Sequence, residues 1–481
     1  MVMEVNGKHD GDLVRLKCSV KQYDWGRIGL DSLVARLFLR NCDDKIDENK
    51  HYAEFWMGTH ESGPSFVVEE KDKEKEIGDL SLKSWISNNP EVLGDTVVDK
   101  WGIDLPFMFK VLSVAQALSI QAHPDKELAG LLHTLKSNVY KDANHKPEMV
   151  LALTEFEALC GFVSFEELEV VLENVPEIME VVGGAYGDEV LPVNEQDNEA
   201  KETQFLQSIF IKLMSAGSKV VSVAVSKLIN RLNKETKTRQ LTSKEELALK
   251  LEKQYPDDIG VIASFLFNHV RLNPGEALYV ASNEIHAYVG GECVECMATS
   301  DNVVRAGLTP KNRDVKILCS MLTYKQGPPE ILKGIPVNAY TKRYNPPFEE
   351  FEVDRCMLDQ GASVVFPAVP GPSIFLILSG QGSMYTSVSS PSSPSSSSPS
   401  SSSLFSSPSS STTSSSLSSP SSSSLPSPFS SLSLAPLYED TVEGGDVFFV
   451  PANTEVHVST ESELHLYRAG VNHVLFSKTL M

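Results

Sequence analysis

One stretch decides how the chain is expected to fold: Pro274–Val280, which reads PGEALYV, with His286 shortly after it. A Pro-Gly pair marks a turn, and the apolar run behind it is typical of a strand. Far upstream, Gln121 and His123 stand two positions apart in an apolar segment. Residues at i and i+2 share one face of a strand, so these two side chains reach the same point. Glu148 adds a carboxylate between the two segments.

These four side chains make a mixed nitrogen and oxygen donor set, which suits a divalent metal such as zinc. Taken one at a time, each has a simpler interpretation as a hydrogen-bonded core residue or, for Glu148, as a solvated strand start. Their combination favours a metal site. With one coordination position open, such a site polarises a substrate oxygen, so the pattern points to catalysis.

The arrangement of the four side chains also predicts the fold. The order suggests a cupin-like jelly roll, in which two ligands lie on one strand, a carboxylate follows and a histidine lies on a later strand. The side chains meet in the interior of the barrel. A second copy of the turn and strand occurs at Gly445–Pro451, followed by His457. No Q-x-H or H-x-H pattern precedes this copy, so we expect His457 to be structural. Two related barrels are therefore predicted, of which only the first binds metal.

Composition limits the classes of protein to which the chain can belong. Its net charge of −22 argues against a general surface for nucleic acid or anionic membranes. Seven cysteines in 481 residues are few, and Cys293 with Cys296 forms an isolated C-x-x-C pattern that we interpret as strand cysteines. No secretory signal is visible, and no apolar run approaches the roughly 20 residues that span a bilayer. A cytoplasmic protein with reduced thiols is the expectation.

The chain divides into mainly β parts and a helical part. Apolar residues recur with helical spacing across 163–259, and Ser164 followed by glutamates is typical of a helix start. Residues 13–162 and 260–325 are rich in short apolar strands, and we assign them to the metal-binding barrel. Residues 326–481 form the predicted C-terminal barrel. The predicted fold class is therefore mainly β with an α-helical domain.

A segment made almost entirely of serine and proline, 387–434, interrupts the C-terminal barrel. It carries too little apolar surface to offset the entropy of ordering, so we expect it to be disordered. Before it, Ser373–Leu378 reads as a buried strand that ends at Gly380–Gly382. After it, Val447–Val450 reads as another strand. The insertion is therefore predicted to lengthen a loop between two strands, which costs little closure entropy.

Five separated motifs resemble one known family. They are Tyr23–Gly26 (YDWG), Trp56–His60 (WMGTH), Gln121–Lys126 (QAHPDK), His145–Met149 (HKPEM) and the long stretch Asn283–Val315. In this order and combination they are similar to type I mannose-6-phosphate isomerases, in particular to plant-like members. The serine–proline insertion departs from that family but leaves every motif intact.

The resemblance implies a zinc enzyme that interconverts mannose 6-phosphate and fructose 6-phosphate and so supplies mannose for GDP-mannose synthesis. It implies one zinc ion per chain, on ligands that fall at Gln121, His123, Glu148 and His286, and an active-site arginine that falls at Arg305. The implied fold is a catalytic jelly roll with an inserted helical domain and a second, C-terminal jelly roll. The expected partner is a small phosphosugar, bound by a monomer without nucleic acid or membrane.

Isomerisation of an aldose to a ketose moves a proton between two carbons and passes through an enediolate. Three residues are candidates to move this proton: Glu295, Lys146 and His145. Burial and neighbouring charges tune the pKa of each type of side chain toward neutrality. Glu295 also has a simpler interpretation as an outward-facing strand residue, and the sequence leaves the choice among the three open.

Cations inside the motifs are candidates to bind the phosphate of the substrate. Arg305 offers a planar fork that suits phosphate or an enediolate oxygen. Lys311 and Lys146 are further candidates, although exposed lysines are common. The remaining substrate-binding candidates are Ser119, Trp25 and Asp301. Ser119 is expected to donate a hydrogen bond to the phosphate or to another part of the substrate. Trp25 is expected to form an apolar wall against the sugar, and Asp301 to orient Arg305.

Two alternatives to an isomerase come from different classes of protein. A catalytically silent cupin would bind sugars without turning them over, and the loss of a ligand or of Arg305 would have favoured it. An interaction scaffold would use the serine–proline segment as its functional part. Neither alternative accounts for a complete metal set together with the arginine, so an isomerase is the leading hypothesis.

Overall fold

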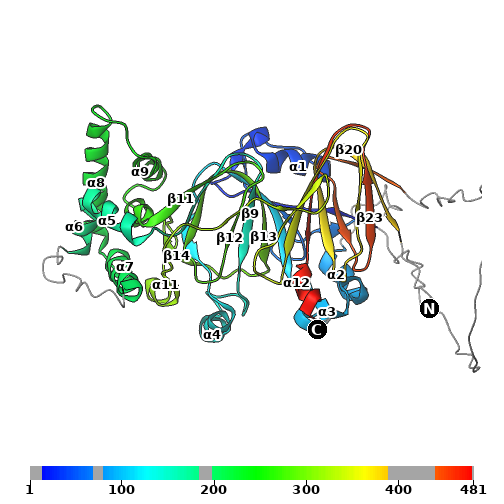
Figure 1. Cartoon of the computed structure of the whole chain (residues 1–481), viewed down its shortest axis with the longest axis horizontal. Helices are drawn as coiled ribbons and strands as arrows, with labels where there is room; N and C mark the ends of the chain where they lie inside the picture. The colour runs from blue at the N-terminus through cyan, green and yellow to red at the C-terminus, as the bar shows by residue number, and fades with distance from the viewer. Residues whose placement is uncertain (1–12, 69–79, 184–197, 388–438, 479–481) are drawn as a thin grey trace, which may run out of the picture.

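The computed structural model describes residues 13–68, 80–183, 198–387 and 439–478. Two sheets of 11 strands each make up the centre and one end of the molecule, and a group of helices lies at the other end (Figure 1). Neighbouring strands in both sheets run antiparallel. Antiparallel sheets combined with an inserted group of helices confirm the predicted fold class at this level.

The first sheet has the strand order β15-β12-β9-β13-β7-β5-β2, with β8, β10, β11 and β14 attached beside this path. Its strands are β2 (Ser19–Lys21), β5 (Glu54–Met57), β7 (Phe107–Val114), β8 (Ile120–Ala122), β9 (Glu148–Ala152), β10 (Phe156–Phe162), β11 (Phe267–Leu272), β12 (Ala277–Val280), β13 (His286–Ala298), β14 (Val304–Gly307) and β15 (Ile331–Leu332). The predicted turn and strand are present, because Gly275 adopts a positive φ of 88° immediately before β12.

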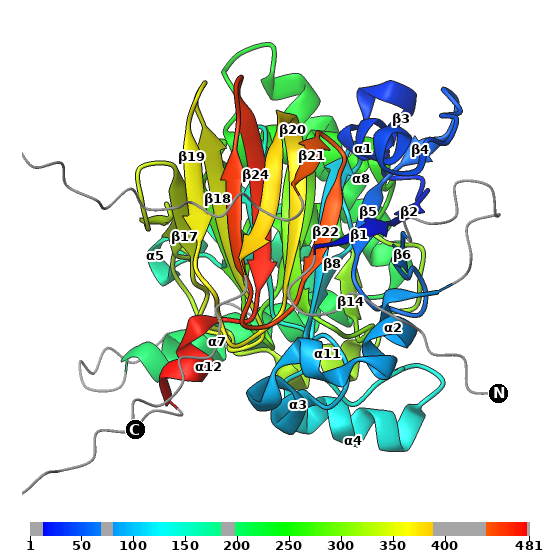
Figure 2. The same cartoon turned by 90° about the vertical axis from the view of Figure 1, so that its right-hand side faces the viewer.

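The second sheet has the order β16-β17-β18-β24-β20-β22-β1-β6, and Figure 2 shows its face with β24 between β18 and β20. Its strands are β1 (Val14–Lys17), β6 (Phe66–Val67), β16 (Ile335–Pro336), β17 (Thr341–Tyr344), β18 (Glu352–Leu358), β19 (Ser363–Phe366), β20 (Ser373–Ser387), β21 (Asp440–Glu443), β22 (Val447–Val450), β23 (Glu455–Ser459) and β24 (Leu464–Gly470). Strand β1 pairs with β22, with Val14 opposite Phe449. The N-terminal segment therefore contributes a strand to the C-terminal sheet. A separate pair is formed by β3 (Arg27–Ile28) and β4 (His51–Tyr52).

The predicted helices are present between β10 and β11. The helices of the described residues are α1 (Leu33–Cys42), α2 (Leu82–Asn88), α3 (Asp95–Trp101), α4 (Lys126–Lys136), α5 (Phe165–Asn174), α6 (Pro176–Val182), α7 (Asn198–Met214), α8 (Ser218–Glu235), α9 (Ser243–Gln254), α10 (Ile259–Ala263), α11 (Val315–Met321) and α12 (His473–Lys478). Ser164 caps α5 as expected, since its side chain accepts a hydrogen bond from the backbone N–H of Glu167. Helix α9 is capped by Thr242, which forms a reciprocal capping box with Glu245.

The aromatic cluster of Phe162, Phe210, Phe267 and Tyr324 joins the helical group to the first sheet. Its ring centroids lie 5.3–6.2 Å apart. Because Phe162 and Phe267 belong to β10 and β11, the helices pack directly on the strands that precede and follow them. Within the described residues no single helix is long and apolar enough to cross a membrane, although α7 and α8 together, as one bent pair, have the length and composition to do so.

The prediction that the strand before the insertion ends at Gly380–Gly382 was wrong. Strand β20 continues through these glycines to Ser387 and pairs with β21 beyond them. Gly380 adopts a φ of +91°, and a Cβ atom there would lie 1.9 Å from the carbonyl oxygen of Glu463. The register of β20 against β24 shifts just before it, between Ile377 and Ser379, and the glycine lets the two strands approach closely without ending the strand.

The serine–proline insertion joins β20 to β21, so it does connect two neighbouring strands of one sheet as predicted. Ser387 is the last residue of β20. The rest of the segment for which we predicted disorder, 388–434, lies outside the described residues.

Candidate metal centre and active site

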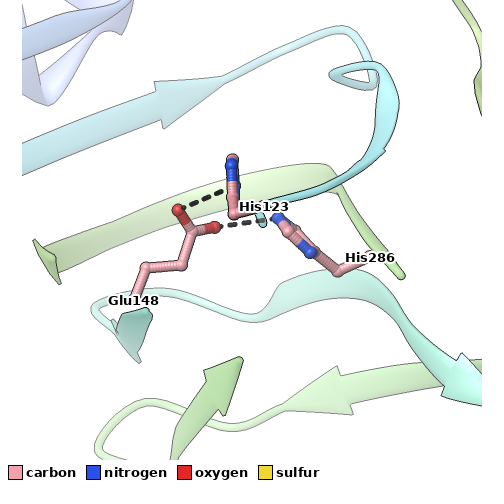
Figure 3. Close-up of side chains that lie close together, drawn as sticks. All are labelled: His123, Glu148 and His286. Carbon is pink, nitrogen blue, oxygen red and sulfur yellow. Dashed lines mark ion pairs between the residues drawn. The ribbon is translucent and has the colours of Figure 1, made fainter. Parts of the chain in front are cut away.

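Three side chains of the predicted metal set converge at one buried point (Figure 3). The Nε2 atom of His123 lies 3.4 Å from Oε2 of Glu148, and Nε2 of His286 lies 3.0 Å from the other oxygen, Oε1. All three side chains are at most 1% exposed. The donor atoms lie within 4.8 Å of one another, which is close enough to share one ion.

Strand register explains why these residues meet. On β8, Gln121 stands opposite His286 of β13 on one side and opposite Arg305 of β14 on the other. Glu148 begins β9, which pairs with β13 as well. Paired residues on neighbouring strands have side chains on the same face, so Gln121, His286 and Arg305 share one face of the sheet.

The two imidazoles present the form that binds a metal. Nδ1 of His123 lies 2.6 Å from the carbonyl oxygen of Asn302, and Nδ1 of His286 lies 3.1 Å from that of Glu284. A carbonyl only accepts hydrogen bonds, so each ring donates from Nδ1 and leaves the lone pair on Nε2.

Both Nε2 atoms are buried and have no hydrogen-bond partner among the described residues. Burial, with the charge of Lys146 as the next cause, lowers the pKa of His123 to about 4, so its ring is neutral at pH 7. A neutral ring with a buried, unpartnered nitrogen beside a carboxylate fits a divalent metal.

A cavity of about 660 Å³ opens beside this centre. Its walls include nine of the predicted site residues: Trp25, Ser119, Gln121, Lys146, Glu148, Glu295, Asp301, Arg305 and Lys311. The structure thus brings together all the substrate-binding candidates and two of the three proton-transfer candidates.

His145 is the predicted site residue that turns away from the cavity. Its Nε2 lies 2.7 Å from Oε1 of Glu350, a largely buried carboxylate on the segment before β18.

Asp301 also has a partner that the sequence did not indicate. Its carboxylate lies 3.3 Å from Nε2 of His60, and this contact lowers the pKa of Asp301. The imidazole of His60, and not the guanidinium of Arg305, is therefore the neighbour of Asp301.

The guanidinium of Arg305 has no ion pair and no hydrogen bond within the part of the chain that the structure describes. The side chain is partly buried, and burial lowers its pKa. A partly buried cation without a carboxylate partner is available to an anionic ligand.

A buried charge network on the cavity wall was not predicted from the sequence. Nζ of Lys110 lies 2.7 Å from Oε2 of Glu295 and 3.6 Å from Oε2 of Glu54. Glu54 in turn accepts a hydrogen bond of 2.6 Å from the indole N–H of Trp56. Burial raises the pKa of Glu295 above that of an ordinary glutamate. A signal was available, because Lys110 is the one charged residue in the apolar strand Phe107–Val114.

Tyr288 is a second residue that sequence analysis missed. It lies two positions after His286 on β13, so the i, i+2 rule applied to Gln121 and His123 would have found it. Its hydroxyl donates a hydrogen bond of 2.7 Å to Oε1 of Glu148 and is buried beside the metal centre. Tyr288 therefore orients the carboxylate.

The other predicted histidine and the cysteines have structural surroundings. His457 stacks on Tyr385 at a centroid distance of 4.5 Å, and its Nε2 lies 2.9 Å from Glu455 at a partly exposed site. Cys293 and Cys296 are free, fully buried residues of β13, where burial raises the pKa of both thiols. The interpretation of the C-x-x-C pattern as strand cysteines is confirmed.

A polar cavity with an unpaired arginine suits a small anion, and a metal-competent donor set on its wall is more typical of enzymes than of carriers. Fold and site thus point to an enzyme whose cavity adjoins three side chains that could hold a metal ion. Residues 13–165 match the model of the phosphomannose isomerase type I catalytic domain, and residues 185–267 match that of the type I helical insertion domain. The chain belongs to the type I phosphomannose isomerase family.

Curated relatives support this assignment over nearly the whole chain. Mannose-6-phosphate isomerase 1 from Arabidopsis thaliana is 52% identical, and the alignment covers 98% of this chain and 97% of that protein. Mannose-6-phosphate isomerase 2 from the same plant is 51% identical. The enzyme from Bos taurus is 44% identical over 70% of this chain and 80% of its own length. The expectations of a plant-like member and of an isomerase are confirmed.

Solved structures share the fold. A variant of phosphomannose isomerase from Salmonella typhimurium has a TM-score of 0.71 at 24% identity and covers 96% of this chain and 100% of its own. A mannose 6-phosphate isomerase bound with zinc and yttrium gives the same TM-score at 23% identity, with the same coverage. At these identities the likeness concerns the fold alone.

Proposed function

We propose that the chain interconverts mannose 6-phosphate and fructose 6-phosphate, using one zinc ion held by Gln121, His123, Glu148 and His286. The observation that carries the proposal is the pair of buried, unpartnered Nε2 atoms directed at the carboxylate beside a charged cavity. The names of the relatives support the substrate, and a related structure with bound zinc supports the ion.

The residues around the cavity have different roles in the proposed reaction. When bound, zinc supplies a Lewis acid for the negative charge that develops on the sugar oxygens of an enediolate. Arg305 adds a fixed positive charge at the same face, because it stands opposite Gln121 across the β8–β14 pair. Ser119 donates a hydrogen bond of 3.0 Å to Oε1 of Gln121 and so steadies that side chain at the cavity wall.

A proton has to leave C2 of the aldose and arrive at C1. Glu295 and Lys146 both face the cavity and remain the candidates to carry it. Burial moves the pKa of Glu295 upward, toward the range in which a carboxylate acts as a general base. Lys146 places its ammonium 3.8 Å from Glu148 Oε2, next to the metal set. His145 is occupied by Glu350, which makes it the weakest of the three.

Phosphate is bound at the rim of the cavity in this proposal. Lys311 is exposed there and is the cation that binds the anion at the solvent side, whereas Arg305 is more buried and is left for the enediolate. Trp25 forms part of the wall and stacks on Tyr23 at 5.9 Å, which gives the sugar an apolar face. Asp301 contacts the sugar, held by His60.

The wider proposal concerns architecture and setting. Each of the two sheets curls into a cupin-like jelly roll, with 13–162 and 260–325 as the catalytic barrel, 163–259 as the helical domain and 326–481 as the C-terminal barrel. Three strands cross these bounds, because β1 and β6 belong to the second sheet and β15 to the first. The chain acts as a cytoplasmic monomer and supplies mannose for GDP-mannose synthesis and glycosylation.

Turnover with and without a chelator tests the proposal. The purified protein, incubated with mannose 6-phosphate, should produce fructose 6-phosphate, lose this activity on chelation and regain it with added zinc. Failure to form product with zinc present would contradict the isomerase and favour the silent sugar-binding cupin. Activity that a chelator leaves intact would contradict only the dependence on metal.

An Arg305→Ala variant tests the role of the arginine. We expect kcat to fall by about 10²- to 10³-fold, as when one preorganised donor to a developing oxyanion is removed. Arg271→Ala is a matched control, because Arg271 is an exposed arginine of the same sheet that pairs with Glu157. Steady-state kinetics of both variants at saturating substrate give the comparison, and full turnover by Arg305→Ala would remove this residue from the mechanism.

A further inference from the structure

The loop between β13 and β14 is tied down by one carboxylate. Asp142, on the segment between α4 and β9, accepts a hydrogen bond of 2.8 Å from the hydroxyl of Ser300 and another of 2.8 Å from the backbone N–H of Asp301. It also accepts from the side-chain amide of Asn302 at 3.2 Å and from the backbone N–H of Asn144 at 2.9 Å. Four donors thus converge on a single side chain.

Hydrogen bonds to backbone carbonyl groups complete this network. The amide of Asn302 donates to the carbonyl oxygens of Asp142 at 2.8 Å and Asn144 at 2.9 Å. Ser300 and Asn302 are buried, at 3% and 1% exposure. The loop therefore has one well-defined position as long as Asp142 accepts these bonds.

That position matters for the metal centre. The carbonyl oxygen of Asn302 is the group that holds Nδ1 of His123 at 2.6 Å and so directs Nε2 toward Glu148. The residue before it, Asp301, presents its carboxylate to the cavity. One loop thus sets the orientation of a metal ligand and the position of a cavity carboxylate, and both depend on the same anchor.

We propose that Asp142 is a positioning residue for the metal centre: it fixes the 300–302 loop, which fixes the tautomer and the direction of the His123 ring. The contacts run from Asp142 through Asn302 to the metal ligand His123, so Asp142 acts on the centre through other residues. The expected effect on zinc affinity rests on the proposed metal site, and the expected effect on turnover rests on the proposed isomerase function.

Asp142→Asn tests the inference with little change in size. The amide nitrogen that replaces one carboxylate oxygen cannot accept a hydrogen bond, so it loses a donor such as the N–H of Asp301. We expect zinc affinity, measured by competition with a chelator, to fall by about 10- to 100-fold, as for other partners of metal-ligating histidines. The lost turnover should return when zinc is added in excess.

Two further variants separate positioning from general stability. Asp446→Asn is the control, because Asp446 lies in the turn between β21 and β22, away from the metal centre, where it accepts a backbone N–H from Glu443 at 2.9 Å and pairs with Arg15. It should lower the melting temperature of the metal-free protein without changing zinc affinity. Ser300→Ala removes the hydroxyl that bonds Asp142 and the carbonyl oxygen of Asn144 and that accepts from the backbone N–H of Asn302, and it should weaken zinc binding in the same direction.

The outcomes are distinct. Zinc affinities of Asp142→Asn and Ser300→Ala within twofold of the unaltered protein would overturn the inference, whatever happens to their melting temperatures. Because zinc binding is measured without substrate, the result stands even if the protein fails to isomerise mannose 6-phosphate. That failure would count against the proposed function. The role of Asp142 at the metal centre would still be decided by the zinc-binding data.

Discussion

His286→Ala is expected to abolish zinc binding at micromolar metal and to reduce turnover by about a thousandfold or more. The metal contributes several kcal/mol to stabilising developing charge, and each factor of ten in rate corresponds to about 1.4 kcal/mol. His286 supplies one of the two imidazole nitrogens that converge on Glu148. Its side chain is 1% exposed, so a water molecule from bulk solvent does not readily take the place of the lost ligand. Metal analysis of the purified variant together with its kcat measures the effect.

His457→Ala provides the control for this experiment. His457 occupies the corresponding place in the second copy of the turn and strand pattern, yet it lies at a partly exposed site against Glu455 and Tyr385. Its replacement should leave zinc content and turnover unchanged. Full zinc content in His286→Ala would show that the centre binds metal through other residues, and the proposed ligand set would then be wrong.

Lys110→Met is expected to destabilise the protein by about 3–5 kcal/mol, the usual cost of leaving a buried charge without its partner. The ammonium of Lys110 lies between the carboxylates of Glu295 and Glu54, and all three side chains are at most 10% exposed. Its loss leaves two buried anions near each other. Urea unfolding of the metal-free variant at pH 7, read by tryptophan fluorescence, measures the free energy of unfolding.

The pH dependence of this loss has a definite sign. Burial already raises the pKa of Glu295, and removing a neighbouring cation raises it further. At a pH above this raised pKa the carboxylate is charged in the folded state and the full penalty applies. Below it the carboxyl group is neutral, so the deficit of Lys110→Met should shrink as the pH is lowered.

Two comparisons make the test specific. Adding Glu295→Gln to Lys110→Met should recover part of the lost stability, because one uncompensated charge is removed. Lys250→Met removes a lysine that pairs with Glu157 at 2.9 Å where the side chains are 40% and 21% exposed, and it should cost no more than about 1 kcal/mol. Equal costs for the two lysines would mean that the Lys110 network contributes no more than a surface pair.

The local part of the site could be predicted from the sequence, because it depends on spacing along the chain. The spacing of Gln121 and His123 pointed to one site, although β8 ends at Ala122 and His123 follows it, and the turn at Gly275 located the strand before His286. Helix caps were found for the same reason, since Ser164 and its bonding partner are neighbours in sequence.

Contacts set by strand register could not be predicted in this way. Lys110 stands opposite Glu295 on β13 and opposite Trp56 on β5, and no local pattern specifies either pairing. His145 faces Glu350, which is 205 positions further along the chain. Gly380 shows the same limit, because a glycine is needed there by the close approach of Glu463 on a distant segment.

The pairing of β1 with β22 has a consequence for biosynthesis. Val14 and Phe449 are neighbours in the folded sheet, so β1 leaves the ribosome long before its partner has been made. Until β22 is made, Val14 and Arg15 lack the strand with which they pair in the folded sheet, and open strand backbone is prone to pairing with foreign strands. The second sheet is thus completed only after nearly the whole chain has emerged, and this late closure is the step at which a chaperone would have most to protect.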